Sequence, residues 1–431
     1  MNKEENGQRQ RSSGNTHGDG GNVSTSVLNP FSSFKYPAYR LYFSTMTSQW
    51  IAMNMQVVVR SLLIYRITGS GAILGSMALA HAIPMLFLSL YGGVIADRLA
   101  KRNILLIGEA GMFLVALSIA LMLTLGYLSV ENPNSWWILI ISSVFQGAIM
   151  GLMMPATMAI IPEIVEERYI TNAISLSNLA MNLFRLVAPA LTGFLVDAFD
   201  FAFIYYTQAV MYLLAATLIY FLPSRKATAD FDSNALEEIR EGFRYIRRET
   251  TVSLIVLFSI LCTVFGMPFT QLLPMFTEDI LNAGATGMGV MLSISGFGSL
   301  LASFVMALMP NKRRGLLMVL SGLIMGLALV GFSFSEWWYP SMVIIAFYGI
   351  GHTGQMTLSV TLIQSYVAAN YRGRVVSFQM MAFGFASLGT FFAGFLSEAI
   401  GIQWSVGGLA IALILICFVM LALSSKLRKL E

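Results

Sequence analysis

The sequence predicts an all-α integral membrane protein with twelve transmembrane helices in two pseudo-symmetric six-helix bundles. Hydrophobic residues occupy 56% of the 431 positions and charged residues only 11%, which is more apolar surface than a soluble fold can bury. Twelve mostly apolar stretches are long enough to cross the hydrocarbon core, which takes about 20 helical residues. The longest polar connection, residues 223–251, divides these stretches into six and six.

Each predicted span ends at turn residues or at charged residues. The twelve spans cover residues 42–66, 72–95, 103–127, 136–161, 172–196, 202–222, 252–274, 285–309, 316–334, 340–366, 376–400 and 403–424. The predicted organisation is a disordered cytosolic tail (1–38), a first bundle (39–222), a linker (223–251), a second bundle (252–424) and a cytosolic tail (425–431). The start of the chain is rich in Gly, Asn, Ser and Gln and lacks the apolar core of a secretory signal.

The basic residues lie on one side of the predicted membrane. If the N-terminus is cytosolic, all but three of the 26 Lys and Arg residues fall in cytosolic segments; the exceptions, Arg60, Arg66 and Arg185, lie inside or at the end of predicted spans. Cytosolic loops typically carry this excess of positive charge. We therefore expect a multi-pass protein of the cytoplasmic (inner) membrane with both termini cytosolic, and no nucleic-acid partner.

The linker contains an apolar stripe at helical spacing. Leu236, Ile239, Phe243 and Ile246 recur every three or four residues, while arginines occupy the other faces. This pattern predicts an amphipathic helix on the inner leaflet that connects the two bundles.

The connection between the second and third spans combines glycine, acidic and basic residues. Gly93 permits a tight turn and close backbone approach, and Asp97 can face a helix N-terminus or a basic partner. Arg98, Lys101 and Arg102 can anchor the connection at the cytosolic interface. A role in topology alone explains the basic residues but not an acid at the membrane edge. We interpret these five residues as a conformational latch between helices that move.

Gly93-x-x-x-Asp97-Arg98 followed by Lys101-Arg102 resembles the signature loop of the major facilitator superfamily, which often has glycine where this chain has Ala100. The resemblance extends over almost the whole chain after residue 38. It implies the major facilitator fold and a secondary transporter whose substrate site lies between two bundles that rock to give alternating access.

Further motifs resemble one branch of this superfamily. They are the Thr68-Gly69-Ser70 turn, the block from Pro155 to Gly193, and Arg372-Gly373-Arg374, which are similar to the branch of enterobactin exporters and macrolide efflux proteins. Pro189 and Gly193 resemble the antiporter motif of the fifth helix, with alanine and threonine in place of two glycines. The resemblance implies export of a siderophore, a macrolide or another amphipathic compound. Import, or flipping of a lysolipid, is the alternative within the same fold.

The fifth predicted span carries a polar stripe. Asn178, Asn182, Arg185 and Pro189 recur at spacings of three and four residues. Arg185 is near the middle of the span, where an unpaired cation costs roughly 3 kcal/mol or more, so it should face a watery cavity or a partner. We interpret Arg185 as an anion-binding or gating residue; the alternative is an arginine held by carbonyls and amides between helices.

The first span is unusually polar. Gln49 and Gln56 share one face with Arg60, and Trp50 and Asn54 form a neighbouring pair. Amides and an aromatic ring at these positions could form one wall of a ligand cavity. For Arg60, which lies about 9 Å from the outer end of the span, snorkelling to the interface is the alternative.

The tenth span places His352 and Gln355 beside a stripe of threonines. Lining a cavity and hydrogen bonding between helices are both compatible with this pattern. The predicted substrate cavity is therefore lined by Gln49, Trp50, Asn54, Gln56, Asn178, Asn182, Arg185, His352 and Gln355.

The sequence contains no Gly-x-x-x-x-Gly-Lys-Ser/Thr loop for a nucleotide, so a gradient should drive transport. Few groups inside the spans can titrate, and the candidates for proton coupling are Glu109, His81 and Glu398, with Glu109 preferred. Glu109 is about two turns from the cytosolic end of its span, and a structural partnership with the basic loop is the alternative.

Other classes of protein fit less well. A multi-span membrane enzyme is a distant alternative, since His-Glu-x-x-His and compact Cys/His sets are missing from the sequence. A receptor would need a sizeable soluble output domain. We expect no cofactor and no metal, and a monomer whose partners are the bilayer, a small-molecule substrate and a proton gradient.

Overall fold

The computed structural model describes residues 31–223, 235–309, 312–368, 371–423 and Leu430. In these residues every regular element is a helix. The predicted tails fall largely outside this part of the chain, as does the start of the linker.

The first half of the chain forms six long helices and four short helical turns. The long helices are α1 (Pro37–Thr68), α2 (Gly71–Arg98), α3 (Lys101–Thr124), α4 (Trp137–Ala159), α6 (Ile170–Ala198) and α7 (Phe201–Tyr220). The short turns are η1 (Ser32–Lys35), η2 (Pro133–Trp136), α5 (Ile161–Ile164) and η3 (Glu167–Tyr169).

The second half begins with the linker helix and continues with seven helices and one π-helical turn. These elements are α8 (Ala235–Arg248), α9 (Thr250–Gly266), α10 (Pro268–Met275), η4 (Phe276–Ile280), α11 (Gly284–Leu308), α12 (Arg314–Ser333), α13 (Trp338–Tyr366), α14 (Arg372–Ile400) and α15 (Ile402–Leu423). Each predicted span overlaps one long helix of the two halves, except for 252–274, which overlaps both α9 and α10.

Nine helical segments of the described residues are long and apolar enough to cross a membrane. The three remaining long helices, α1, α13 and α14, have 32, 29 and 29 residues and are therefore also long enough. Helices α1 and α13 contain more polar residues than the other spans, and the described apolar stretch of α14 is Gly384–Ile400. The described residues therefore agree with the prediction of an all-α integral membrane protein.

Several helix ends lie a few residues from the predicted ones, and two differences affect the packing. Helix α1 begins at Pro37, before the predicted start at 42, and its beginning is tied to α6: the Ser33 backbone N–H donates to Asn172 Oδ1 (3.1 Å) and the Tyr39 hydroxyl to the Ala173 carbonyl (2.8 Å). The predicted span 252–274 is broken between α9 and α10 and then continues as η4. Pro268 and Pro274, which lack the backbone N–H, lie in this irregular stretch.

The connections between helices alternate between two ends of the molecule. One end, the basic face, carries α8 and the connections α2–α3, α4–α6, α11–α12 and α13–α14. The other end, the acidic face, carries Arg66 as its one described basic residue, with the acidic residues Glu131, Asp197, Asp200, Glu278, Asp279, Glu336 and Glu398.

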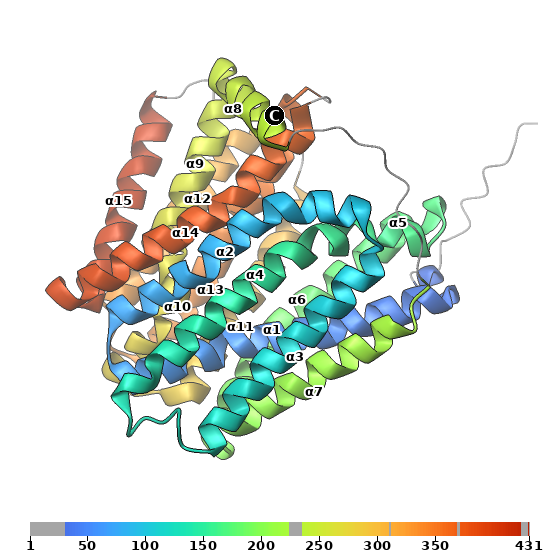
Figure 1. Ribbon diagram of the computed structural model, residues 1–431. Helices are drawn as coiled ribbons and strands as arrows, with labels where there is room; N and C mark the ends of the chain where they lie inside the picture. Colours follow the sequence, from blue (N-terminus) through green and yellow to red (C-terminus); the bar gives the residue numbers. More distant parts are fainter. Residues whose placement is uncertain (1–30, 224–234, 310–311, 369–370, 424–429, 431) are drawn as a thin grey trace, which may run out of the picture.

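Within each half the helices pack closely, and two helix pairs make the most extensive contacts between the halves. In the first half, α2 packs on α4 and α7 on both α1 and α3; in the second, α13 packs on both α11 and α12. The pairs α2–α14 and α6–α11 join the halves. Figure 1 shows α2 running alongside α14, and α8 crossing the ends of the helices at the basic face.

The linker helix α8 packs against α9 and α14. The Tyr245 ring stacks on Tyr371 with 4.4 Å between centroids, and Ile246 is buried, while Phe243 is half exposed. An amphipathic helix in the linker is therefore observed at the basic face; the side chains of Leu236 and Ile239, which belong to the predicted stripe, lie outside the described set.

Candidate functional site between the two halves

The pair α6–α11 makes backbone contact through glycines. A Cβ atom on Gly193 would lie 2.2 Å from the Ala285 carbonyl oxygen, and one on Gly289 would lie 2.2 Å from that of Pro189. No side chain fits in these gaps, so glycine is required for the helices to approach this closely. Both residues of the predicted antiporter-like motif, Pro189 and Gly193, therefore lie at the contact between the halves.

The pair α2–α14 is similarly close near the acidic face. A Cβ atom on Gly71 would lie 2.2 Å from Ser397 Oγ, and one on Gly394 would lie 2.2 Å from the Gly71 carbonyl oxygen. Towards the basic face this contact continues as far as Leu86 and Gly384. The comparable contact on α6–α11 reaches Gly296, whose Cβ position is 3.2 Å from the Arg185 carbonyl oxygen.

Polar contacts close the acidic face. Arg66 Nη2 lies 2.9 Å from Glu278 Oε1, and the Tyr65 hydroxyl donates to Asp279, so the end of α1 is joined to η4. On α6, Asp197 Oδ2 accepts from the backbone N–H of Thr286 on α11 (2.8 Å). These contacts, which we call the acidic-face latch, link the two halves at three positions along the chain.

Glu398 belongs to the same closure. Its carboxylate accepts from the Ser70 hydroxyl and from the backbone N–H of Ala72 (3.2 Å), and Ser70 is the N-cap of α2. An acid on α14 thus caps a helix of the other half, where the helix dipole favours negative charge.

Near the middle of the helices, Arg185 of α6 faces aromatic side chains of α13. Arg185 is exposed and interacts electrostatically with His352 and Tyr348. The His352 and Tyr348 rings stack with 5.9 Å between centroids, and the Tyr348 hydroxyl donates to the Gly266 carbonyl (3.4 Å). Tyr348 is buried and His352 is half-buried, so the two halves bring together a cation and one partly accessible aromatic ring.

The polar stripe of α6 continues from Arg185 towards the basic face. Asn178 is exposed and Asn182 is half-buried, on the same side of the helix as Arg185. Leu179 and Leu183 are also exposed, but they point to a different side. Helix α6 thus has one polar and one apolar exposed surface in its basic-face half.

The polar residues of α1 and α13 divide into two groups. Trp50 and Asn54 are half-buried, and the Asn54 amide donates to the Trp50 carbonyl (2.8 Å). Gln49, Gln56 and Gln355 are buried. The predicted cavity set is therefore not uniformly accessible in this conformation.

Gln56 and Gln355 both have partners inside their own half. Gln355 donates to the Ser359 hydroxyl (3.0 Å). Gln56 donates to Gln146 Oε1 on α4 and accepts from the Tyr212 hydroxyl on α7 (3.3 Å). Arg60 Nη1 also lies 3.4 Å from Gln146 Oε1. Arg60 is 7% exposed, so its side chain packs in the bundle and does not snorkel.

Gln146 and Tyr212 are polar residues that the sequence analysis did not select. Gln146 is the one amide in α4, a signal that could have identified it. Tyr212 has three other tyrosines around it in α7, and no periodicity distinguishes it from them.

Glu109 is completely buried, and neither carboxylate oxygen has a hydrogen-bond partner among the described residues. The basic residues at the start of its helix have other partners. Lys101 pairs with Glu163, and Arg102 Nη2 donates to the Tyr220 carbonyl (2.6 Å). Neither Lys101 nor Arg102 is therefore seen to pair with Glu109, and the side chain of Arg98 lies outside the described residues. His81 Nδ1, on α2, is likewise buried without a partner in the described part.

The predicted conformational latch is only partly covered by the structure. Lys101 and Arg102 bond within the first half, to α5 and α7 respectively. Gly93, Asp97 and Arg98 have side-chain positions outside the described residues, so the role predicted for them stays a prediction.

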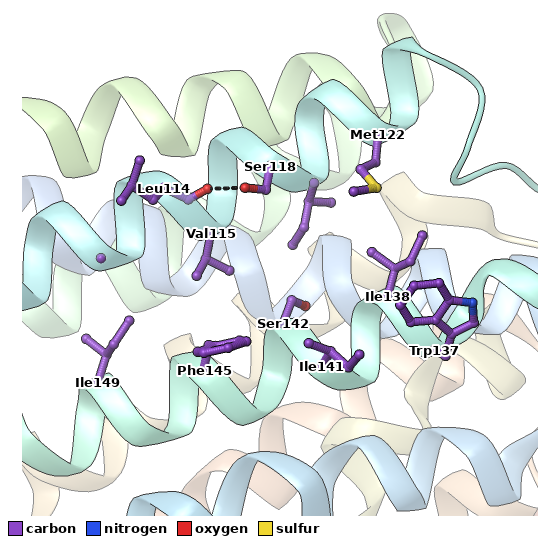
Figure 2. A pocket seen from close by; sticks show the side chains of 12 residues that line it. Leu114, Val115, Ser118, Met122, Trp137, Ile138, Ile141, Ser142, Phe145 and Ile149 are labelled. Atoms are coloured by element: carbon purple, nitrogen blue, oxygen red, sulfur yellow. Dashed lines mark hydrogen bonds between the residues drawn. The ribbon is translucent and has the colours of Figure 1, made fainter.

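A separate groove of about 440 Å³ lies between α3 and α4. Figure 2 shows its walls, which include Val115, Ile138 and Phe145. Its two hydroxyl groups are already bonded to their own helices: Ser118 donates to the Leu114 carbonyl (2.7 Å) and Ser142 to the Leu139 carbonyl (2.8 Å). The groove thus offers mainly apolar contact, and both its hydroxyl groups are already bonded, unlike the surface around Arg185.

Comparison with known proteins gives a family and several relatives. A family model described as "Transmembrane secretion effector" matches residues 26–431. The staphyloferrin A transporter of Staphylococcus aureus is 25% identical, over 83% of this chain and 89% of that protein. Macrolide efflux protein A of Streptococcus pyogenes is 21% identical, over 92% of this chain and 99% of that protein. The crystal structure of the nucleoside transporter NupG has the same fold, with a TM-score of 0.70 and 14% sequence identity. The match covers 90% of this chain and 98% of NupG.

Proposed function

Because this chain belongs to the transmembrane secretion effector family of major facilitator transporters, we propose that it exports a sizeable amphipathic molecule by alternating access, in exchange for protons. That it is a membrane transporter and not an enzyme follows from the family. The direction, the driving ion and the substrate class are our proposal, and the arguments for them follow.

The orientation rests on charge. The basic face carries the connections rich in Lys and Arg, and such connections remain in the cytosol. We place this face and both termini in the cytosol, with the protein in the inner membrane. The acidic face is then external, and its latch closes the route to the outside. The described conformation thus corresponds to an inward-facing state.

The single observation that carries the substrate site is the placement of Arg185. A cation in the middle of a membrane span is stable only beside water, an anion or another partner. Arg185 is exposed on the polar side of α6 and faces His352 and Tyr348 of the other half. A ligand bound here would contact both halves, which is what alternating access requires.

The substrate class follows from this chemistry and from the relatives. Arg185 offers a strong site for a carboxylate or a similar anion, while Trp50 and His352, which are both half-buried, offer aromatic surface. The names of the relatives specify staphyloferrin A and macrolides. We therefore propose an anionic amphipathic substrate, a siderophore, and keep a macrolide, which is not an anion, as the second candidate.

Proton coupling requires a carboxyl group that changes its protonation during the cycle. Glu109 is the buried acid of the first half that has no partner among the described residues, and an unpaired charge in such a position is costly. Glu398 has partners in the latch, and His81 is the remaining candidate. We assign the exchanged proton to Glu109.

Import and lysolipid flipping are the competing functions. A flippase would need a path for acyl chains to reach the central site, and the apolar groove of Figure 2 is the described surface closest to that chemistry. The site around Arg185 and His352 is more polar, which favours a water-soluble amphipathic substrate.

The test is flux in proteoliposomes with an imposed pH gradient. Ferric and iron-free staphyloferrin A, a macrolide and a fluorescent lysolipid are presented to the wild type, Arg185→Ala and Glu109→Gln. Arg168→Ala is the control, because Arg168 is exposed at the basic face and bonds to Glu166 beside it.

We expect the pH gradient to drive accumulation of one anionic compound by the wild type. Arg185→Ala and Glu109→Gln should lose this accumulation, and the control Arg168→Ala should keep it. Movement of the lysolipid alone, or flux that ignores the gradient, would overturn the proposal.

A further inference from the structure

The groove between α3 and α4, which we call the α3–α4 groove, is an apolar surface that the proposed transport does not use. Its walls include Leu114 of α3 and Phe145 of α4, whose side chains are 59% and 57% exposed. Lipid tails are as apolar as leucine, so exposed apolar side chains of membrane spans contact lipid. Ser118 and Ser142 bond to their own helices, which leaves the walls compatible with a hydrocarbon chain.

The α3–α4 groove is about as long as one leaflet is deep. Along α3 its lining residues run from Gly111 to Met122, and along α4 from Trp137 to Ile149. These distances are about 17 Å and 18 Å at the helical rise. Half of the hydrocarbon core of a bilayer measures about 15 Å. Side chains of the two helices line the groove along this length (Figure 2).

The groove is closed near the middle of the membrane. Gly111 is ten residues from the first residue of α3, about 15 Å from the basic face. A Cβ atom on Gly111 would lie 2.9 Å from Ile149 Cδ1, and one turn further the Met153 side chain covers Gly108. Side chains of α4 thus fill the space between the helices beyond this point. A chain that enters from the acidic face ends here, and the groove gives no path to the other leaflet.

The width of the groove selects its occupant. A volume of about 440 Å³ over this length gives a cross-section of roughly 26 Å². A helix with its side chains is 10–12 Å in diameter and would occupy roughly 80 Å² or more. The groove is therefore too narrow to receive a helix of a partner protein or of a second copy, and it suits an extended hydrocarbon chain.

The open end of the groove has the character of a membrane interface. Trp137 and Tyr127 are exposed there, and both residue types are enriched where the lipid headgroups begin. The connection from α3 to α4, residues 125–136, contains the exposed Glu131 as its one charged residue. A carboxylate attracts an ammonium group and repels a lipid with a net negative charge. The charge at this end therefore favours a zwitterionic headgroup.

We propose that the α3–α4 groove binds one acyl chain of a zwitterionic phospholipid from the leaflet at the acidic face, whose ammonium group pairs with Glu131. The chain lies along Val115 and Phe145, and its end reaches Gly111. The hydrophobic effect does not favour this position over the bulk bilayer, because lipid tails are equally apolar. The affinity comes from van der Waals contact with two walls and from the headgroup. The site is separate from Arg185 and does not depend on the direction or the driving ion of transport.

The test counts the lipids that stay bound to the full chain. The protein is placed in nanodiscs with equal amounts of phosphatidylcholine and phosphatidylglycerol of one chain length, and native mass spectrometry records the lipids retained after release. Val115→Phe and Ser118→Phe each place a ring in the groove. Val210→Phe is the matched control, because Val210 is exposed on α7 and both valines lie nine residues from the acidic-face end of their helices. Glu131→Gln removes the headgroup partner.

A second measurement keeps the protein in the bilayer. The emission of Trp137 is obtained by subtracting the spectrum of Trp137→Phe, and lipids with brominated chains quench it. Brominated phosphatidylcholine diluted in phosphatidylglycerol is compared with the reverse mixture. This comparison reports the headgroup preference at the open end of the groove without any release step.

We expect wild-type molecules to retain one phospholipid, with phosphatidylcholine favoured over phosphatidylglycerol at least about fivefold. Val115→Phe and Ser118→Phe should lower the retained fraction at least about fivefold, since the ring takes the place of the chain. Val210→Phe should retain lipid like the wild type. Glu131→Gln should remove the headgroup preference in both measurements. Matching gel-filtration profiles establish that the variants are folded.

Three results would overturn the site. Equal retention in Val115→Phe, Ser118→Phe and Val210→Phe would mean that the lipid is bound elsewhere. A preference for phosphatidylglycerol would exclude the pairing with Glu131. No retained lipid, together with equal quenching of Trp137 by the two lipids, would show ordinary contact with the bilayer and no binding site.

Discussion

Arg66 Nη2 of α1 donates to Glu278 Oε1 of η4 across 2.9 Å, and this ion pair joins the two halves of the chain at the acidic face. The side chains are 28% and 24% exposed, and Asp197 lies 3.9 Å away from the same guanidinium. One cation therefore holds two acids from different halves. A partly solvated pair of this type contributes about 1 kcal/mol or less, so it can open during a transport cycle.

The first prediction concerns this pair. Arg66→Ala should raise the ratio of open to closed molecules by about fivefold, because about 1 kcal/mol of closed-state stabilisation is lost. The measurement is the rate at which a membrane-impermeant maleimide labels a cysteine at the buried position Ser293. The exchange Arg66→Glu with Glu278→Arg is the control, and it should restore slow labelling. Equal rates in Arg66→Ala and the wild type would contradict the latch.

The second prediction concerns the close contact of α6 with α11. Gly289→Ala places a methyl group where the Pro189 carbonyl oxygen lies 2.2 Å away, so the closed state should become inaccessible while the separated state remains possible. Maleimide labelling at position 293 should become fast. Gly408→Ala is the matched control, since nothing lies within 4 Å of its Cβ position. If both glycine variants label slowly, the contact does not define the closed state.

The third prediction concerns Arg185. Arg185→Ala should weaken binding of an anionic substrate at least about tenfold, because a charge-assisted hydrogen bond is worth roughly 1.5–3 kcal/mol. Arg185→Lys should retain part of the affinity, since it keeps the charge but not the planar fork. Isothermal titration calorimetry measures both, with a neutral macrolide as the comparison ligand. An equal loss for neutral and anionic ligands would indicate that Arg185 supports the structure and not the anion.

The fourth prediction concerns Lys101 and Glu163, which pair at the basic face with side chains 16% and 27% exposed. Removing either partner should lower thermal stability. Removing both should lower it by less than the sum of the two single losses. A coupling free energy of about 1 kcal/mol is expected from a double-mutant cycle. Arg168 and Glu166, exposed at 70% and 54%, form the comparison pair and should show little coupling. Strict additivity at Lys101 and Glu163 would mean that the contact does not stabilise the fold.

Much of the fold could be predicted from local features. The length of an apolar stretch decides whether it can cross a membrane, and Pro, Gly or charged residues mark its ends. The motif around Lys101 and Arg102 indicated the family, which the comparisons confirm. The end of the span predicted at residue 274 was inaccurate, since helical structure continues to the end of η4. It continues past Pro274 because tertiary contacts hold Glu278 and Asp279 against α1.

The candidate site was predicted less completely. The spacing on α1 correctly grouped Gln56 with Arg60, but it could not show that this face turns towards Gln146 and Tyr212 inside the first half. Those partners lie 90 and 156 residues away from Gln56 along the chain, and no local pattern relates them. The rarity of carboxylates in spans is enough to single out Glu109. Only the coordinates show that its carboxylate has no hydrogen-bond partner among the described residues.

The sequence by itself determined the membrane class, the helical segments and the distribution of basic residues, because hydropathy and charge act on each segment independently of its neighbours. Only the tertiary structure decided which polar stripe faces the contact between the halves and which is buried within one of them. A helix with polar residues on several faces can satisfy them in more than one way, and the choice depends on packing against helices distant in the chain. For this reason Arg185 lies at the interface between the halves, whereas Arg60, equally unusual in the sequence, is enclosed with Gln146 in the first half.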